Sequence, residues 1–121
     1  MIKEECLSAE TNISSKQKML SGVIDYISKN YTTENISVKK LAQIGNVSEV
    51  YLRRVFNSVY GTSPLNYINS LRLDYAQSLL KSGEYSVTEV CYMSGFNDIS
   101  YFSRYYKKYF GISPQNSKLN N

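Results

Sequence analysis

A fourteen-residue pattern that occurs twice constrains the fold of this chain more than any other feature. It reads YLRRVFNSVYGTSP from Tyr51 and YFSRYYKKYFGISP from Tyr101. Tyr, Arg, Gly, Ser and Pro recur in register, and the bulky apolar or aromatic positions between them recur at helical spacing. Each copy therefore predicts an amphipathic helix that ends at its glycine, where a left-handed residue can terminate the backbone pattern.

The rest of the chain also follows a helical period, and no alternating apolar and polar run indicates a strand. Serine residues that can cap helices precede two short apolar segments, and Ser86 and Glu89 have the spacing of a capping box. We therefore predict an all-α fold of about seven helices with two helix-turn-helix units. The expected divisions are a flexible tail or linker remnant over 1–15, a first unit over 16–63, a connecting helix over 64–82 and a second unit over 83–121.

In each unit a short helix, a glycine turn and a longer basic helix follow one another. Gly45 with Asn46, and Gly95 in the second copy, can adopt the positive φ that such a turn requires. A helix-turn-helix motif has this layout, and its second helix enters the DNA major groove. The recognition helices are expected over about 48–60 and 98–110.

A projection at 100° per residue separates a core face from a DNA face on both long helices. The expected core positions are Leu52, Phe56, Val59, Tyr60, Phe102, Tyr106, Tyr109 and Phe110. The opposite sector and its neighbouring basic residues supply the candidate DNA contacts: Val50, Arg53, Arg54, Asn57, Ser100, Ser103, Arg104, Lys107 and Lys108. Arginine can bond guanine with two donors, asparagine can bond adenine, and valine can pack on a thymine methyl, whereas lysine suits phosphate. The hydroxyls of Tyr51 and Tyr101 could also reach phosphate.

Two recognition helices on one side of a duplex must lie about 34 Å apart to enter successive major grooves. The connecting helix, at about 1.5 Å per residue, has a length of the right order. Because one chain carries both helices, we expect a monomeric module that reads an asymmetric site.

Composition excludes several other functions. The chain has no histidine and two cysteines, so we predict no catalytic residue, no metal site, no cofactor and no enzymatic activity. The net charge of +4 alone says little about partners, but after Asp98 there are only basic charged residues, which favours a polyanion. Lacking both an apolar run of about 18 residues and a basic-then-apolar start, the chain is expected to be cytoplasmic and to have no membrane partner.

The segments LAQIGNVSEVYLRRVFNSVYGTSPLNYINSLRLDYAQSLL and SVTEVCYMSGFNDISYFSRYYKKYFGISP resemble the AraC-type (AraC/XylS) transcriptional regulators. The resemblance covers about residues 16–118. It implies two helix-turn-helix units that bind double-stranded promoter DNA and change the recruitment of RNA polymerase, with activation the family tendency. The base-reading positions that it implies are Val50, Arg53, Arg54, Ile99, Ser100, Ser103 and Arg104. Ile99 comes from the resemblance alone, since the projection places it near the buried side.

Most members of that family attach this module to a sensing or receiver domain, and none is recognisable here. The chain therefore reads as the C-terminal module of a larger regulator or as a short stand-alone one. Cys91, Ser94 and Tyr106 depart from the family pattern. The segment PQNSK departs from it too, and this last departure suggests a frayed last helix. Arg72 on the connecting helix is expected to pack locally or to pair with Asp74 or Asp25. The alternative from a different class is an α-helical protein-interaction module without DNA binding.

Overall fold

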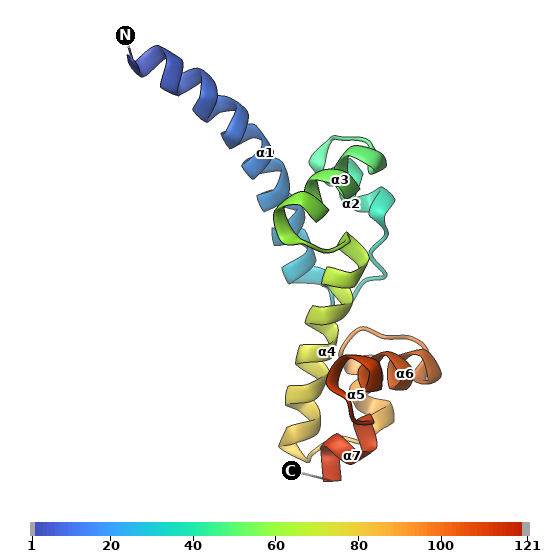
Figure 1. Ribbon diagram of the computed structural model, residues 1–121. Helices are drawn as coiled ribbons and strands as arrows, with labels where there is room; N and C mark the ends of the chain where they lie inside the picture. Colours follow the sequence, from blue (N-terminus) through green and yellow to red (C-terminus); the bar gives the residue numbers. More distant parts are fainter. Residues whose placement is uncertain (1, 120–121) are drawn as a thin grey trace. The chain divides into compact units, whose positions relative to one another are not determined.

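The computed structural model describes the backbone of residues 2–119 and the side chains of residues 15–118. Seven helices and no strand occur in this described backbone, which confirms the all-α prediction (Figure 1). They are α1 (Ile2–Asn30), α2 (Val38–Gly45), α3 (Glu49–Tyr60), α4 (Pro64–Ser82), α5 (Val87–Met93), α6 (Ile99–Phe110) and α7 (Pro114–Leu119).

Helix α1 is longer than the sequence pattern predicted. It begins at Ile2, so most of the segment expected to form a tail over 1–15 is helical backbone. The segment can form a helix because it contains no residue that breaks one: neither glycine nor proline occurs before Gly22. The prediction relied on apolar residues at helical spacing, and this pattern marks only the part of a helix that is buried. A helix can continue beyond its buried part.

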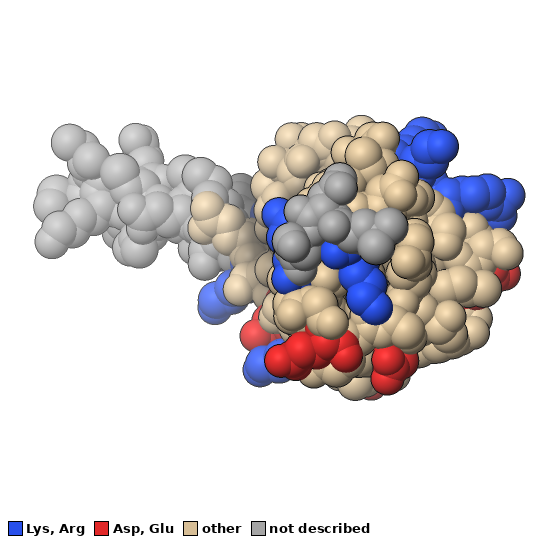
Figure 2. All heavy atoms as spheres, turned by 90° about the horizontal axis from the view of Figure 1, so that it is seen from below, with Lys and Arg blue, Asp and Glu red and all other residues tan. Residues whose placement is uncertain are grey.

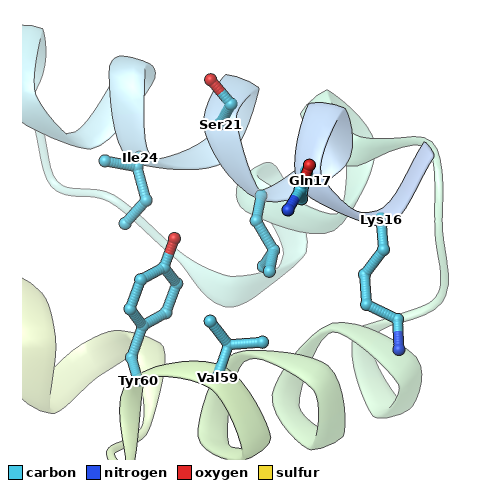
Figure 3. Close-up of a pocket in the computed structure, with 7 residues that line it drawn as sticks. Lys16, Gln17, Ser21, Ile24, Val59 and Tyr60 are labelled. Atoms are coloured by element: carbon cyan, nitrogen blue, oxygen red, sulfur yellow. The ribbon is translucent and has the colours of Figure 1, made fainter. Parts of the chain in front are cut away.

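Residues 1–29 and 36–64 form one compact unit, which contains α2, α3 and most of α1. Its fully covered side chains include Val23 and Ile27 from α1, Leu41 from α2, and Leu52 and Phe56 from α3. The core prediction is wrong for two residues at the end of α3, because Val59 is 52% exposed and Tyr60 is 39% exposed. Both side chains face α1 across an open groove of about 560 Å³ that Ile24 and Lys16 also line, so α1 covers this end of α3 only partly (Figure 3).

Residues 30–35 and 65–121 form the other compact unit, with α5, α6, α7 and nearly all of α4. One apolar cluster fills it, made of Leu73, Ala76, Leu80, Val90, Cys91, Phe96, Phe102 and Tyr106. The predicted core positions Phe102 and Tyr106 are fully buried, and Phe110 packs against the cluster from its edge. Tyr109 is 49% exposed, so its assignment to the core is wrong. The helical projection gave the direction of its side chain, but the last turn of α6 is only partly covered by other elements.

Two departures from the family pattern pair with each other. The hydroxyls of Tyr106 and Ser117 lie 2.6 Å apart in a buried hydrogen bond, and this contact ties α6 to α7. Ser117 belongs to the segment for which fraying was suggested, yet its side chain is only 5% exposed. Tyr106 has a hydroxyl where the family usually has phenylalanine, and Ser117 of the unusual segment PQNSK supplies the hydrogen-bond partner for it.

Ser94 and Cys91, two further departures from the family pattern, are both fully buried. The Ser94 hydroxyl donates to the carbonyl oxygen of Val90 at 2.7 Å, so a buried polar group has its partner within its own helix. Cys91 is fully buried, and burial raises the pKa of its thiol to about 11.

Candidate nucleic-acid interface

The turn between α2 and α3 depends on two different properties of neighbouring residues. Ser37 caps α2 by accepting a hydrogen bond from the Lys40 amide at 3.1 Å, and Asn46 ends the helix in the left-handed conformation with φ 54°. Gly45 does not adopt positive φ, although the sequence suggested it. A Cβ at Gly45 would lie 2.9 Å from Cγ of Met19, so this glycine lets α2 approach α1.

The turn between α5 and α6 reaches the same end by other means. The capping box is complete: the Ser86 hydroxyl accepts from the Glu89 amide at 3.1 Å, and the Glu89 carboxylate accepts from the Ser86 amide at 2.9 Å. Here glycine supplies the positive φ, since Gly95 has φ +103°. Asp98 then accepts from the Tyr101 amide at 3.0 Å and starts α6.

The candidate DNA-contact residues of α3 all lie on its exposed side. Val50 is 72% exposed, and Arg53, Arg54 and Asn57 are also exposed. Arg53 pairs with Glu49 at 3.5 Å across one helical turn, a partly exposed ion pair of small energetic value. The Arg54 guanidinium lies 5.7 Å from the centre of the Tyr51 ring. This distance is within the range of a cation–π contact, which at an exposed site is weak.

The corresponding residues of α6 are less uniform. Ser100, Arg104, Lys107 and Lys108 are exposed, whereas Ser103 is half-buried. Arg104 lies along its own helix, with Nε donating to the Ser100 carbonyl oxygen at 3.3 Å. Ile99 is half-buried and packs against the apolar cluster, as the helical projection indicated and the family position did not.

The sequence did not predict how α6 is fastened to α4. The Tyr101 hydroxyl accepts a hydrogen bond from the amide of Asn69 at 3.2 Å, and the Tyr105 hydroxyl donates to Asn66 Oδ1 at 3.3 Å. The two tyrosine rings lie 5.6 Å apart, centre to centre. The Tyr101 hydroxyl, for which the sequence suggested a phosphate contact, accepts this bond and keeps its own proton available for donation. The pairing joins residues 32 positions apart, so no local sequence signal could have revealed it.

Tyr101 and Tyr105 also shape the surface beside the basic residues. Together with Arg104 and Lys108 they line a shallow hollow of about 310 Å³ on α6. Cationic side chains beside aromatic rings can hold a phosphate or a sugar edge, because charge and flat apolar surface lie together.

On the face drawn in Figure 2, positive charge is local rather than continuous. Lys and Arg side chains lie there in separate groups, one of them next to Asp and Glu side chains. Among the described residues, no cluster of three potential metal-ligating side chains occurs, and no helix has the length and apolar character needed to cross a bilayer. The exposed sides of α3 and α6 can bind a ligand through hydrogen bonds and positive charge.

Two short-helix, turn, long-helix units within one chain define a helix-turn-helix protein of the two-unit kind. Comparison with known proteins agrees, since residues 41–118 match the family model described as "Helix-turn-helix domain". The chain belongs to the AraC-type helix-turn-helix family of transcriptional regulators.

Curated relatives carry this module as part of a longer chain. The transcriptional regulator GbdR of Pseudomonas aeruginosa is 39% identical over 85 residues, which cover 70% of this chain and 23% of GbdR. The virulence regulon transcriptional activator VirF of Yersinia enterocolitica is 30% identical over 94 residues, which cover 78% of this chain and 34% of VirF. The chain thus spans about a quarter to a third of the length of these relatives.

Solved structures show the same fold. The C-terminal domain of AraT, a response regulator from Geobacillus stearothermophilus, superposes with a TM-score of 0.79 at 28% identity, with 85% of each chain covered. The DNA-binding domain of AdpA, solved in complex with a target DNA, gives a TM-score of 0.78 at 28% identity, covering 84% of this chain and 90% of that one.

Proposed function

We propose that this chain binds double-stranded promoter DNA in a sequence-specific manner, with α3 and α6 entering successive major grooves. One observation carries the proposal: both helices bury one sector, expose the other, and present an arginine at the same register on the exposed side, Arg54 and Arg104. The similarity to the AdpA domain, which was solved with its target DNA, supports the same function.

The proposed division of labour follows from the chemistry of each side chain. Arg54 and Arg104 bond guanine edges, Asn57 bonds adenine, and Val50 packs on a thymine methyl. Ser100 and Ser103 contact bases or nearby phosphates, and Arg53 contributes less because Glu49 holds it in part. Lys107 and Lys108 neutralise phosphates. Ile99 contacts DNA only at the edge of its half-buried side chain.

At the level of biological role, we propose transcriptional activation through recruitment of RNA polymerase, by a module that binds as a monomer within a larger cytoplasmic regulator. The name of the relative VirF, a transcriptional activator, supports the sign of regulation. The small share of each relative that the chain covers supports a further sensing or receiver domain. As a functional plan we propose a first helix-turn-helix unit over 16–63, a connecting helix over 64–82 and a second unit over 83–121. In packing, residues 30–35 and nearly all of the connecting helix group with the second unit.

Selection of bound sequences from a random duplex pool tests the proposal. We expect one asymmetric site containing two conserved half-sites about 10 base pairs apart, which is the repeat of the major groove. The selected duplex is then titrated at two salt concentrations against a duplex with both half-sites scrambled.

A selection that enriches no sequence, together with binding that is insensitive to salt, would contradict the proposal. That result would instead favour the alternative of a helical module that binds protein, because release of condensed cations makes DNA binding steeply dependent on salt.

A further inference from the structure

Arg72, on α4, is a buried arginine whose hydrogen bonds go to backbone rather than to an acid. Its side chain is 7% exposed. Nε donates to the carbonyl oxygen of Tyr31 at 2.7 Å, and Nη2 donates to that of Glu34 at 2.9 Å. The expectation of local packing or pairing with Asp74 or Asp25 is wrong, because both hydrogen-bond partners lie far away in the sequence, 41 and 38 positions before Arg72. Burying a guanidinium is costly unless hydrogen bonds replace its contacts with water, and here two of its N–H groups bond carbonyl oxygens of the loop.

The same loop is held from a second side. The Arg72 guanidinium lies 5.9 Å from the centre of the Phe96 ring, next to Gly95 in the α5–α6 turn. A Cβ at Gly95 would overlap with the Tyr31 carbonyl oxygen and would lie 2.9 Å from Arg72 Nε. The turn of the second helix-turn-helix motif therefore packs directly on the backbone that Arg72 binds.

This loop belongs to a different unit from the helices on either side of it. Residues 30–35 group with residues 65–121, whereas residues 1–29 and 36–64 form the other unit. The chain therefore passes between the units at three points: after residue 29, after residue 35 and after residue 64. Two of the three passages exist only while the loop stays attached to the unit that contains Arg72.

We propose that Arg72 is a positioning residue for DNA reading: by clamping loop 30–35 to the second unit, it turns one chain connection between the units into three. The inference rests on the proposed function. With one connection, the two recognition helices sample many separations; with three, they are restricted. Restricting a tether raises the effective concentration at the matching half-site spacing and lowers it elsewhere. Arg72 thereby sets how strictly the protein selects the distance between half-sites.

The first test needs no DNA. A glutamate-specific protease can cleave after Glu34, in the clamped loop, and after Glu84, in the exposed loop that follows α4. In Arg72→Met, we expect cleavage after Glu34 to accelerate about tenfold, because local opening becomes easier. Cleavage after Glu84 serves as the internal reference and should stay within about twofold of the parent. Lys81→Met, an exposed cation on the same helix, is the matched control and should behave like the parent at both sites.

The second test measures half-site spacing. Parent, Arg72→Met, Arg72→Lys and Lys81→Met are titrated with the selected duplex, with each half-site alone, and with duplexes that carry one, two or five extra base pairs between the half-sites. For Arg72→Met we expect about tenfold weaker binding to the intact site, unchanged binding to each half-site, and a smaller penalty for inserted base pairs. Arg72→Lys keeps the charge but has no fork to bridge two carbonyls, so it should be intermediate.

The outcomes separate the two proposals. If Arg72→Met binds each half-site like the parent and keeps the parent's full spacing penalty, the positioning role is wrong. If Arg72→Met does not fold, Arg72→Lys decides by the same criterion. If the parent itself binds no duplex, the proposed function fails, and the protease assay still reports on the clamp: equal cleavage after Glu34 in parent and Arg72→Met overturns it.

Discussion

At the scale of single residues, the arginines on the exposed faces of α3 and α6 carry the proposed specificity. Arg54→Ala and Arg104→Ala should each weaken binding to the selected site by about 1–3 kcal/mol, because a bidentate contact to guanine is lost. Titration of the purified variants against the selected duplex measures the loss. Lys81→Ala is the control for removing an exposed cation from this chain.

Both arginine variants should melt at the parent's temperature, since both side chains are exposed and support no core contact. Binding equal to the parent's in both variants would contradict the assignment of these faces to the groove. A loss on selected and scrambled duplexes alike would assign the arginines to phosphates instead of bases.

A second residue-scale prediction concerns the buried pair Tyr106 and Ser117. Tyr106→Phe leaves the Ser117 hydroxyl buried without its partner and should lower the free energy of unfolding by about 1–3 kcal/mol. The double variant Tyr106→Phe with Ser117→Ala removes both polar groups and should regain much of that loss. Chemical denaturation of the four proteins of the cycle gives the coupling. Additive losses would mean that the pair contributes no joint stabilisation.

At the scale of the element, the capping box makes the stability of the start of α5 depend on pH. The Ser86 amide donates to Glu89, and this bond holds the pKa of the Glu89 carboxyl below its ordinary value. Because this pKa is lower in the folded than in the unfolded state, the carboxylate stabilises the folded protein fully at a pH above the ordinary pKa of a carboxyl group. The stabilisation is lost as the pH falls through the pKa of the folded state.

Glu89→Gln should therefore reduce the loss of stability on acidification, while leaving a protein that is less stable than the parent at neutral pH. Thermal melts from pH 7 down to about pH 3 test this. Glu84→Gln, in the preceding loop, is the control and should follow the parent's curve. A parent and a Glu89→Gln variant with parallel stability curves would show that the carboxylate contributes nothing at the cap.

At the scale of the whole molecule, DNA binding should depend steeply on salt. If the five proposed cationic contacts Arg53, Arg54, Arg104, Lys107 and Lys108 all displace condensed cations, log K should fall against log salt with a slope of about −4.5. Lys107→Gln should reduce the magnitude of this slope by about one and weaken selected and scrambled duplexes alike. A slope near zero would contradict binding to DNA by these residues.

Much of the fold was predictable because helix ends are encoded locally. The N-caps of α2, α3, α5 and α6 are Ser37, Ser48, Ser86 and Asp98, and Gly61 and Gly111 end α3 and α6 in the left-handed conformation. These bonds join residues a few positions apart, so their geometry follows from backbone chemistry alone.

Burial was harder to predict, because it depends on where a neighbour ends. The helical period placed Leu52, Phe56, Phe102 and Tyr106 correctly in the core. It failed for Val59, Tyr60 and Tyr109, in the last turns of α3 and α6. It also missed Val55, which is 6% exposed, and Leu73, which is fully buried. A period reports the direction of a side chain, whereas cover at a given turn requires another element to reach that turn.

The sequence by itself determined the helix caps and the ends of α3 and α6, since these follow from interactions within one turn of helix. Only the tertiary structure decided what Gly45, Gly95 and Arg72 are for. Two of them admit a close approach from a distant segment, and the third binds the carbonyls of residues 38 and 41 positions away. Contacts at such separations form when the chain packs, and a local pattern carries no record of them.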